Sequence, residues 1–237
     1  RFRTLELARH RRQRHPLHQH VLVERRQVQP VGLRQALRNA LDLRALALVF
    51  LAVDKGSHVV VLGLNGAGKT TLLRILAGVD DPDTGHVVAG HGLRLGYYAQ
   101  EHETLDIGRS VLANMKTAAP ELADTDVRKV LGSFLFSGDD VDKPASVLSG
   151  GEKTRLALAM LVSSSANVLL LDEPTNNLDP ASRAEVLSAI KRYPGAIVLV
   201  THDEGAVRAL DPDRVLLLPD GVEDLWSPEY TDLVALA

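Results

Sequence analysis

Short apolar runs alternate with amphipathic stretches over most of the chain. The first run, HVVVL at 58–62, leads through a glycine-rich turn into a segment with helical periodicity. Three similar runs follow at 168–172, 196–200 and 214–219, and an amphipathic stretch over 180–193 separates the first two. Runs rich in β-branched residues and leucine predict buried strands, and their alternation with helices favours a mainly parallel sheet in an α/β domain.

Weaker patterns fill the region between the first two apolar runs. Residues 80–100 predict a turn, a strand, a second turn and a second strand, with Pro82 and Gly85 as the breaks. Residues 105–147 show mixed helical patterns. We therefore expect a small helical subdomain, which we place at about 102–165.

The composition is that of a globular chain. Its 237 residues are 45% hydrophobic, enough to bury a core as one domain or as a domain with a subdomain. There is no cysteine, which excludes disulfides and cysteine-ligated metals and agrees with a cytoplasmic location. The longest apolar run, at 45–53, is shorter than the ~20 residues of a membrane helix, and no secretory signal is recognised. Because residue 1 is arginine, we expect a fragment or a processed chain.

Charge divides the chain into two parts. Residues 1–47 contain 11 arginines, no lysine and three acidic residues, whereas the remainder contains 16 basic and 27 acidic residues. The first part also has four histidines between His10 and His20. This break predicts an atypical Arg/His-rich segment at 1–48 and a folded domain at 49–237.

A glycine-rich loop follows the first predicted strand. Its sequence at 63–70, GLNGAGKT, matches the phosphate-loop pattern G-x-x-x-x-G-K-[ST] in the strand–loop–helix context that this pattern requires. Glycines let backbone N–H groups face a phosphate, and the helix start adds partial positive charge. Lys69 can reach the β- and γ-phosphates of ATP, and the Thr70 hydroxyl can ligate Mg²⁺. The predicted nucleotide-binding residues of the loop are Gly63, Asn65, Gly66, Gly68, Lys69, Thr70 and Thr71.

Two adjacent carboxylates end the run at 168–172. Asp172 fits the aspartate that holds Mg²⁺ beside a phosphate loop, and Glu173 fits a general base for a water that attacks the γ-phosphate. Without the phosphate loop, an acidic turn before Pro174 would be the better interpretation.

A second anion site is predicted at 149–152. Ser149 and Glu152 form an S-x-x-E capping box ahead of an apolar helix, but a cap does not account for Gly150 and Gly151. Two glycines in a first helical turn cost ~1 kcal/mol each, and they leave bare N–H groups for a bulky anion. A second copy of the domain, packed head-to-tail, would bring this site to the phosphate at Lys69.

Together these motifs resemble the nucleotide-binding domain of the ATP-binding cassette (ABC) superfamily over about 50–237. In family order they are Walker A at 63–71, the Q-loop residue Gln100, the signature at 149–152, Walker B at 168–173, the D-loop at 177–179 and the switch histidine His202. The resemblance implies a P-loop NTPase (RecA-like) core, a small antiparallel β-subdomain and an α-helical subdomain. It also implies two ATP molecules, each closed between Walker A of one cassette and the signature of the other.

Three site assignments come from the resemblance. Gln100 is assigned to Mg²⁺ and to water sensing, Asp179 to the nucleotide interface and His202 to the γ-phosphate, so that Gln100 and His202 join Glu173 as the predicted catalytic residues. Simpler interpretations stay open: a loop residue for Gln100, a helix N-cap before Pro180 for Asp179, and a strand-end polar residue for His202.

Two stretches point to one group within the superfamily. SGGEKTRLALA and DEPTNNLD resemble the ABC-F proteins, which are paired-cassette ATPases that act on ribosomes, and PEYTDLVALA resembles the end of their C-terminal cassette. The implied partners are a second cassette and the ribosome. The alternatives are the ATP-binding subunit of an ABC membrane transporter and a degenerate nucleotide-binding module.

The first 48 residues depart from the family pattern. No aromatic residue occurs between Phe2 and Phe50 to stack on adenine, and the first strands of the β-subdomain are not recognisable. The segment could bind RNA through its charge, could be a transit peptide although it is poor in serine, or could be an out-of-frame translation. The missing aromatic and the return to family pattern near residue 50 favour the third interpretation.

Overall fold

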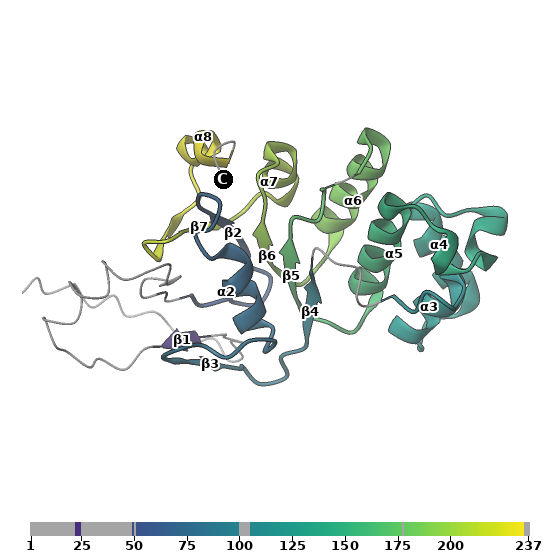
Figure 1. Cartoon of the computed structure of the whole chain (residues 1–237), viewed down its shortest axis with the longest axis horizontal. Coiled ribbons are helices and arrows are strands. Elements are labelled where there is room, and N and C mark those ends of the chain that lie inside the picture. Colours follow the sequence, from purple (N-terminus) through teal and green to yellow (C-terminus); the bar gives the residue numbers. More distant parts are fainter. Residues whose placement is uncertain (1–21, 25–48, 50, 100–104, 177, 235–237) are drawn as a thin grey trace, which may run out of the picture.

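A computed structural model describes residues 22–24, 49, 51–99, 105–176 and 178–234. A six-stranded sheet lies at the centre, in the order β4-β5-β6-β2-β7-β8 (Figure 1). Its strands are β2 (His58–Leu62), β4 (Leu95–Tyr98), β5 (Val168–Asp172), β6 (Ala196–Val200), β7 (Arg214–Leu217) and β8 (Val222–Leu225). The first five strands of that order are parallel, and β8 is antiparallel to β7. The mainly parallel α/β sheet predicted from the apolar runs is therefore confirmed.

Helices connect the strands and cover both faces of the sheet. The α-helices of the described residues are α2 (Lys69–Leu76), α3 (Val111–Ala118), α4 (Asp124–Ser133), α5 (Gly150–Ser163), α6 (Pro180–Arg192), α7 (Glu204–Leu210) and α8 (Thr231–Val234). The same part of the chain also forms the short 3₁₀ helices η1 (Gly138–Asp142), η2 (Ala145–Val147) and η3 (Pro228–Tyr230).

Alternate side chains of the central strands enter two different cores. On β5, Leu169 and Leu171 pack in a cluster with Leu156 of α5, whereas Val168 and Leu170 pack in a cluster with the apolar side chains of α2. This separation follows from the two-residue period of a strand. Helices α2 and α5 therefore lie on opposite faces of the sheet.

A group of helices stands beside the β4 edge of the sheet. Helices α3 and α4 pack against α5 and lie together at the far right of Figure 1. Their contacts are apolar, because Met115, Leu131 and Phe134 are almost completely buried. The helical subdomain expected from the resemblance is thus present, while its limits at about 102–165 stay a prediction because residues 102–104 lie outside the described part.

A second, two-stranded sheet corrects one expectation. β1 (Leu22–Glu24) pairs antiparallel with β3 (His86–Val88), so a strand exists within the segment where none was recognised. Three residues are too short for a periodic signal, which is why the sequence did not reveal β1. The two strands predicted over 80–100 also separate, since β3 joins this small sheet and β4 pairs in parallel with β5.

Candidate functional site

The predicted site residues lie at one edge of the central sheet. β5, β6 and β2 are consecutive parallel strands, so Asp172 at the end of β5 lies at the same edge as His202 and Gly63, which follow β6 and β2. In open parallel sheets, ligands bind at this edge. The fold thus brings together groups that are more than one hundred residues apart in the chain.

Glycine is required at more than one position of the loop between β2 and α2, and Gly63 and Gly68 show the two reasons. A Cβ on Gly63 would lie 2.6 Å from the backbone carbonyl oxygen of Leu218, which follows β7. Gly68, directly before α2, has φ 96°, a conformation that side chains with a Cβ rarely adopt. The loop therefore takes its shape from its own glycines and from a close approach to the end of β7.

Lys69 is held inside the loop. Its side chain is buried, and Nζ donates to the backbone carbonyl oxygens of Gly63 at 2.5 Å and of Leu64 at 3.4 Å. Burial lowers the pKa of Lys69, while the carboxylates of Glu173 and Asp172 act to raise it. A cationic group is thus placed between the glycine loop and the acidic end of β5.

Asp172 contacts the first turn of α2 from the end of β5. Its side chain is only 2% exposed and accepts a hydrogen bond from the Thr70 hydroxyl. Burial raises the pKa of Asp172, and the hydrogen bond with Thr70 and the charge of Lys69 oppose that rise. Oδ2 is buried and has no hydrogen-bond partner within the described residues. A carboxylate with an unused oxygen beside a hydroxyl fits Mg²⁺, which binds one or two protein oxygens together with phosphates and water.

Glu173 follows directly in an unusual backbone conformation. Its φ is 50°, which is uncommon for any residue except glycine, and its N–H donates to the carbonyl oxygen of Val200 at 2.9 Å. Oε1 lies 3.0 Å from Nδ1 of His202, whereas Oε2 is buried without a partner in the described part of the chain. The turn thus directs the carboxylate to His202 and leaves one oxygen available.

The predicted capping box is present at the start of α5. Ser149 Oγ accepts from the N–H of Glu152 at 3.3 Å, and Glu152 Oε2 accepts from both the N–H and the hydroxyl of Ser149 at 2.8 Å. These bonds from Ser149 lower the pKa of the Glu152 carboxyl. Ser149 and Gly150 are exposed, and no atom lies within 4 Å of a Cβ built on Gly150. The helix start is open to a ligand, but α5 lies on the opposite face of the sheet from α2.

Asp179 adopts the N-cap role that its sequence context also predicted. It accepts from the N–H groups of Ala181 and Ser182, each at 3.1 Å, and from the Ser182 hydroxyl at 2.5 Å, with Pro180 in the first turn of α6. The hydrogen bond with the Ser182 hydroxyl is the main cause that lowers the pKa of Asp179. A role for Asp179 at a nucleotide interface stays a prediction.

The remaining predicted residues are less informative. Asn65 and Gly66 are exposed at the tip of the loop, Thr71 is half-buried on α2, and Gln100 lies outside the described residues, as does Asn177 of the D-loop.

Sequence reasoning missed the carbonyl of Leu218, because a backbone contact between distant segments leaves no local signal. It also missed Ser182, which the spacing Asp179-x-x-Ser182 after a cap could have indicated.

These features define a P-loop nucleotide-binding domain. The chain belongs to the ABC transporter family, since the sequence profile of that family matches residues 46–176. This membership confirms the expected class of ABC-type ATPase domain.

The curated relatives include both bacterial and plant proteins. The chain is 44% identical over 185 residues to the putative ATP-binding protein YdiF of Bacillus subtilis, covering 78% of this chain and 29% of YdiF. It is 38% identical over 211 residues to the probable ATP-binding protein YbiT of Escherichia coli O157:H7, covering 84% and 40%. It is 35% identical over 182 residues to ABC transporter F family member 5 of Arabidopsis thaliana, covering 76% and 26%. The resemblance to ABC-F proteins is thus confirmed, and the chain spans less than half the length of these relatives.

Solved structures support the fold. The chain matches the ATP-binding cassette MJ0796, solved as a dimer in a post-hydrolysis state with ADP and Pi, with a TM-score of 0.63 and 22% identity over 75% of this chain and 89% of that one. At this identity the match establishes the cassette fold alone. Within the described residues, no helix is long and apolar enough to span a membrane.

Proposed function

We propose that this chain is a cassette that binds Mg-ATP and hydrolyses it as one half of a head-to-tail pair, in a cytoplasmic protein that acts on ribosomes. The observation that carries the proposal is the buried Asp172 carboxylate, which contacts Thr70 in the first turn of the phosphate-loop helix and has one unused oxygen. A structural aspartate without a ligand would have no reason to keep that oxygen buried and unpaired.

The phosphate groups of ATP would be held by the loop between β2 and α2. The N–H groups that open α2 and the Lys69 ammonium supply the positive charge that a triphosphate needs. Thr70 and Asp172 are the residues that would hold Mg²⁺, which when bound neutralises charge on the β- and γ-phosphates. Lys69 would exchange its bonds to the Gly63 and Leu64 carbonyls for bonds to phosphate oxygens.

Hydrolysis would use the carboxylate of Glu173. Its free Oε2 accepts the proton of a water molecule as the water oxygen forms a bond to the γ-phosphorus. The bond from that phosphorus to the bridging oxygen breaks, and ADP and inorganic phosphate are the products. His202, 3.0 Å from Oε1, orients the carboxylate and reaches the edge where the γ-phosphate would lie.

The positions of α2 and α5 are the reason for proposing a second cassette. Their starts carry the two predicted anion sites, yet the helices occupy opposite faces of one sheet. A second cassette in head-to-tail orientation would supply its Ser149, Gly150 and Gly151 to the phosphate bound at Lys69. The dimeric state of the solved cassette MJ0796 supports such a pair.

The ribosome is favoured as the partner by the ABC-F relatives and by the pattern of SGGEK and TNNLD. The competing function is the ATP-binding subunit of a membrane transporter. The two functions predict different binding partners for the ATP-bound protein when hydrolysis is blocked: a ribosome in the first case and an integral membrane protein in the second.

Two experiments test the proposal. Lys69→Ala should abolish binding of a fluorescent ATP analogue, whereas Lys191→Ala, the same change at an exposed position on α6, should leave it unchanged. The full-length parent with Glu173→Gln should co-sediment with ribosomes in Mg-ATP without any membrane component. Unchanged affinity in Lys69→Ala would remove that residue from the site, and recovery only with an integral membrane protein would establish the transporter alternative.

A further inference from the structure

One buried hydrogen bond joins the central sheet to the helix that carries the signature. The hydroxyl of Tyr98, at the end of β4, donates to Oγ1 of Thr154 on α5 over 3.4 Å. Tyr98 is 7% exposed and Thr154 is 3% exposed. The site as predicted from sequence uses neither residue, although Tyr98 lies two positions before Gln100.

Thr154 occupies a particular place on α5. It follows Gly150 by four residues and Gly151 by three, so it lies on the same side of the helix as both glycines. A bond to Thr154 therefore restrains the face of α5 that opens at the predicted anion site. Its partner belongs to the strand that leads directly into the Q-loop.

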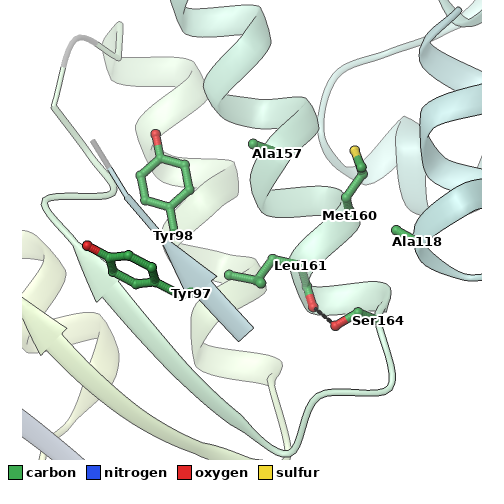
Figure 2. A pocket seen from close by; sticks show the side chains of 7 residues that line it. All are labelled: Tyr97, Tyr98, Ala118, Ala157, Met160, Leu161 and Ser164. Carbon is green, nitrogen blue, oxygen red and sulfur yellow. Dashed lines mark hydrogen bonds between the residues drawn. The ribbon is translucent and has the colours of Figure 1, made fainter. Parts of the chain in front are cut away.

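The packing of α5 on β4 differs along the helix. At Gly96 the contact is close, because a Cβ there would lie 2.6 Å from Cδ1 of Leu161. A cavity of about 150 Å³ lies beside this contact, lined by Tyr97, Tyr98, Ala118, Ala157, Met160, Leu161 and Ser164 (Figure 2). Figure 2 shows Tyr98 extending beside α5 next to Ala157, with Met160 and Leu161 further along the helix.

The cavity borders the carboxyl-terminal half of α5, where Ala157, Met160 and Leu161 line it. Side chains that border a cavity lose the dispersion contacts that would otherwise hold the helix in one orientation. The Tyr98–Thr154 bond lies nearer the start of α5 than this region and joins β4 to the amino-terminal half of the helix, which also packs through the fully buried Leu156. Burial raises the pKa of Tyr98, so the hydroxyl keeps its proton and remains a donor.

We propose that Tyr98 is a positioning residue for ATP hydrolysis, whose hydroxyl sets the orientation of α5 and thereby the position of Ser149, Gly150 and Gly151 toward the partner cassette. This inference rests on the proposed head-to-tail function. At 3.4 Å the bond is longer than the usual ~2.8 Å, so a small movement of α5 toward β4 would strengthen it. Binding of ATP to a single cassette does not involve this bond, because Lys69 and Thr70 belong to α2 and Asp172 belongs to β5.

The test separates turnover from nucleotide binding in the full chain. Tyr98→Phe should lower kcat about fivefold, the effect of losing one hydrogen bond, with ATP-analogue affinity unchanged. Thr154→Val removes the same bond together with a further interaction of Thr154, and it should lower kcat at least as much. Thr154→Ser keeps the hydroxyl and should retain the parent kcat. The double variant should lose no more than Thr154→Val alone, because the bond to Tyr98 is already absent in that variant.

A matched control removes a different tyrosine hydroxyl. Tyr193 is buried and donates to the carbonyl oxygen of Ala166 at 2.8 Å, away from the Tyr98–Thr154 contact. Tyr193→Phe should therefore lower the melting temperature without changing kcat. Normal turnover in Tyr98→Phe, or a decrease in kcat for the double variant that equals the two single decreases combined, would overturn the role of Tyr98. Neither result would contradict the proposed function. A parent without any turnover that depends on Glu173 would contradict the proposed function and this inference together.

Discussion

The carboxylate of Glu173 and the imidazole of His202 meet at the ends of two neighbouring parallel strands, with Oε1 3.0 Å from Nδ1. Glu173 is mostly buried and reaches this position through a backbone φ of 50°, whereas His202 is half exposed. Backbone strain of this kind is often found at functional sites. The pair therefore has an acceptor that is shielded from solvent and a partner that is open to a ligand.

The first prediction concerns Glu173→Gln. Glutamine keeps the size of the side chain and can bond the attacking water, but it cannot take the proton. We expect ATP binding to persist and turnover to fall by at least about 100-fold. Size-exclusion chromatography should show a pair only with Mg-ATP, since the γ-phosphate that joins the cassettes survives. The control is Glu185→Gln, the same change on α6. Full turnover in the Glu173 variant would show that another group is the base.

The second prediction concerns Asp172→Asn. Burial raises the pKa of Asp172 in the folded chain, so the folded state disfavours the charged form. The cost of ionising Asp172 lowers the stability of the folded chain only where the carboxyl is charged. This cost is absent below the pKa of Asp172 in the unfolded chain and complete above its pKa in the folded chain. The variant should therefore be more stable than the parent to denaturant near neutral pH, equal to it in acid, and deficient in Mg²⁺-dependent hydrolysis. A loss of stability at neutral pH would show that the carboxylate supports the fold.

The third prediction concerns Gly63→Ala. The added methyl would lie 2.6 Å from the Leu218 carbonyl oxygen, which is backbone and cannot rotate away. We expect a loss of about 1–3 kcal/mol in the free energy of unfolding, the usual cost of overpacking, together with weaker ATP binding. The control is Gly132→Ala on α4, where nothing lies within 4 Å of the new methyl. Equal stability of the two variants would contradict the close approach.

The fourth prediction concerns the capping box. Hydrogen bonds from the backbone N–H and the hydroxyl of Ser149 lower the pKa of the Glu152 carboxyl in the folded chain. The ionised carboxylate therefore stabilises the fold above the pKa that Glu152 has in the unfolded chain, and this stabilisation is lost as the pH falls through its pKa in the folded chain. Glu152→Gln should cost about 0.5 kcal/mol near neutral pH, since partial exposure screens the charge at the helix start, and nothing in acid. Thermal unfolding across pH measures this. Glu121→Gln, an exposed change of the same charge, should show no such dependence.

Local chemistry was enough to predict much of this fold. The apolar runs that became β2, β5, β6 and β7 are strands of five residues or fewer whose central residues are buried, and burial on both faces favours apolar side chains there. The pattern of apolar residues did not predict β8, because the side chains of this strand are mostly exposed. Its pairing with β7 is what makes it a strand. The pattern failed in the same way at β1, which exists through its register with β3.

What the sequence by itself determined is the chemistry of the site: the glycine loop, Lys69 and Thr70, the paired acids Asp172 and Glu173, and the capped helix start at Ser149. Each depends on neighbours within a few residues, so a short motif specifies it. Only the tertiary structure decided that Asp172 bonds Thr70, that Leu218 requires Gly63, and that Tyr98 reaches Thr154. These contacts join residues 56 to 155 positions apart, and such distances are set by the packing of both faces of the sheet rather than by any local preference.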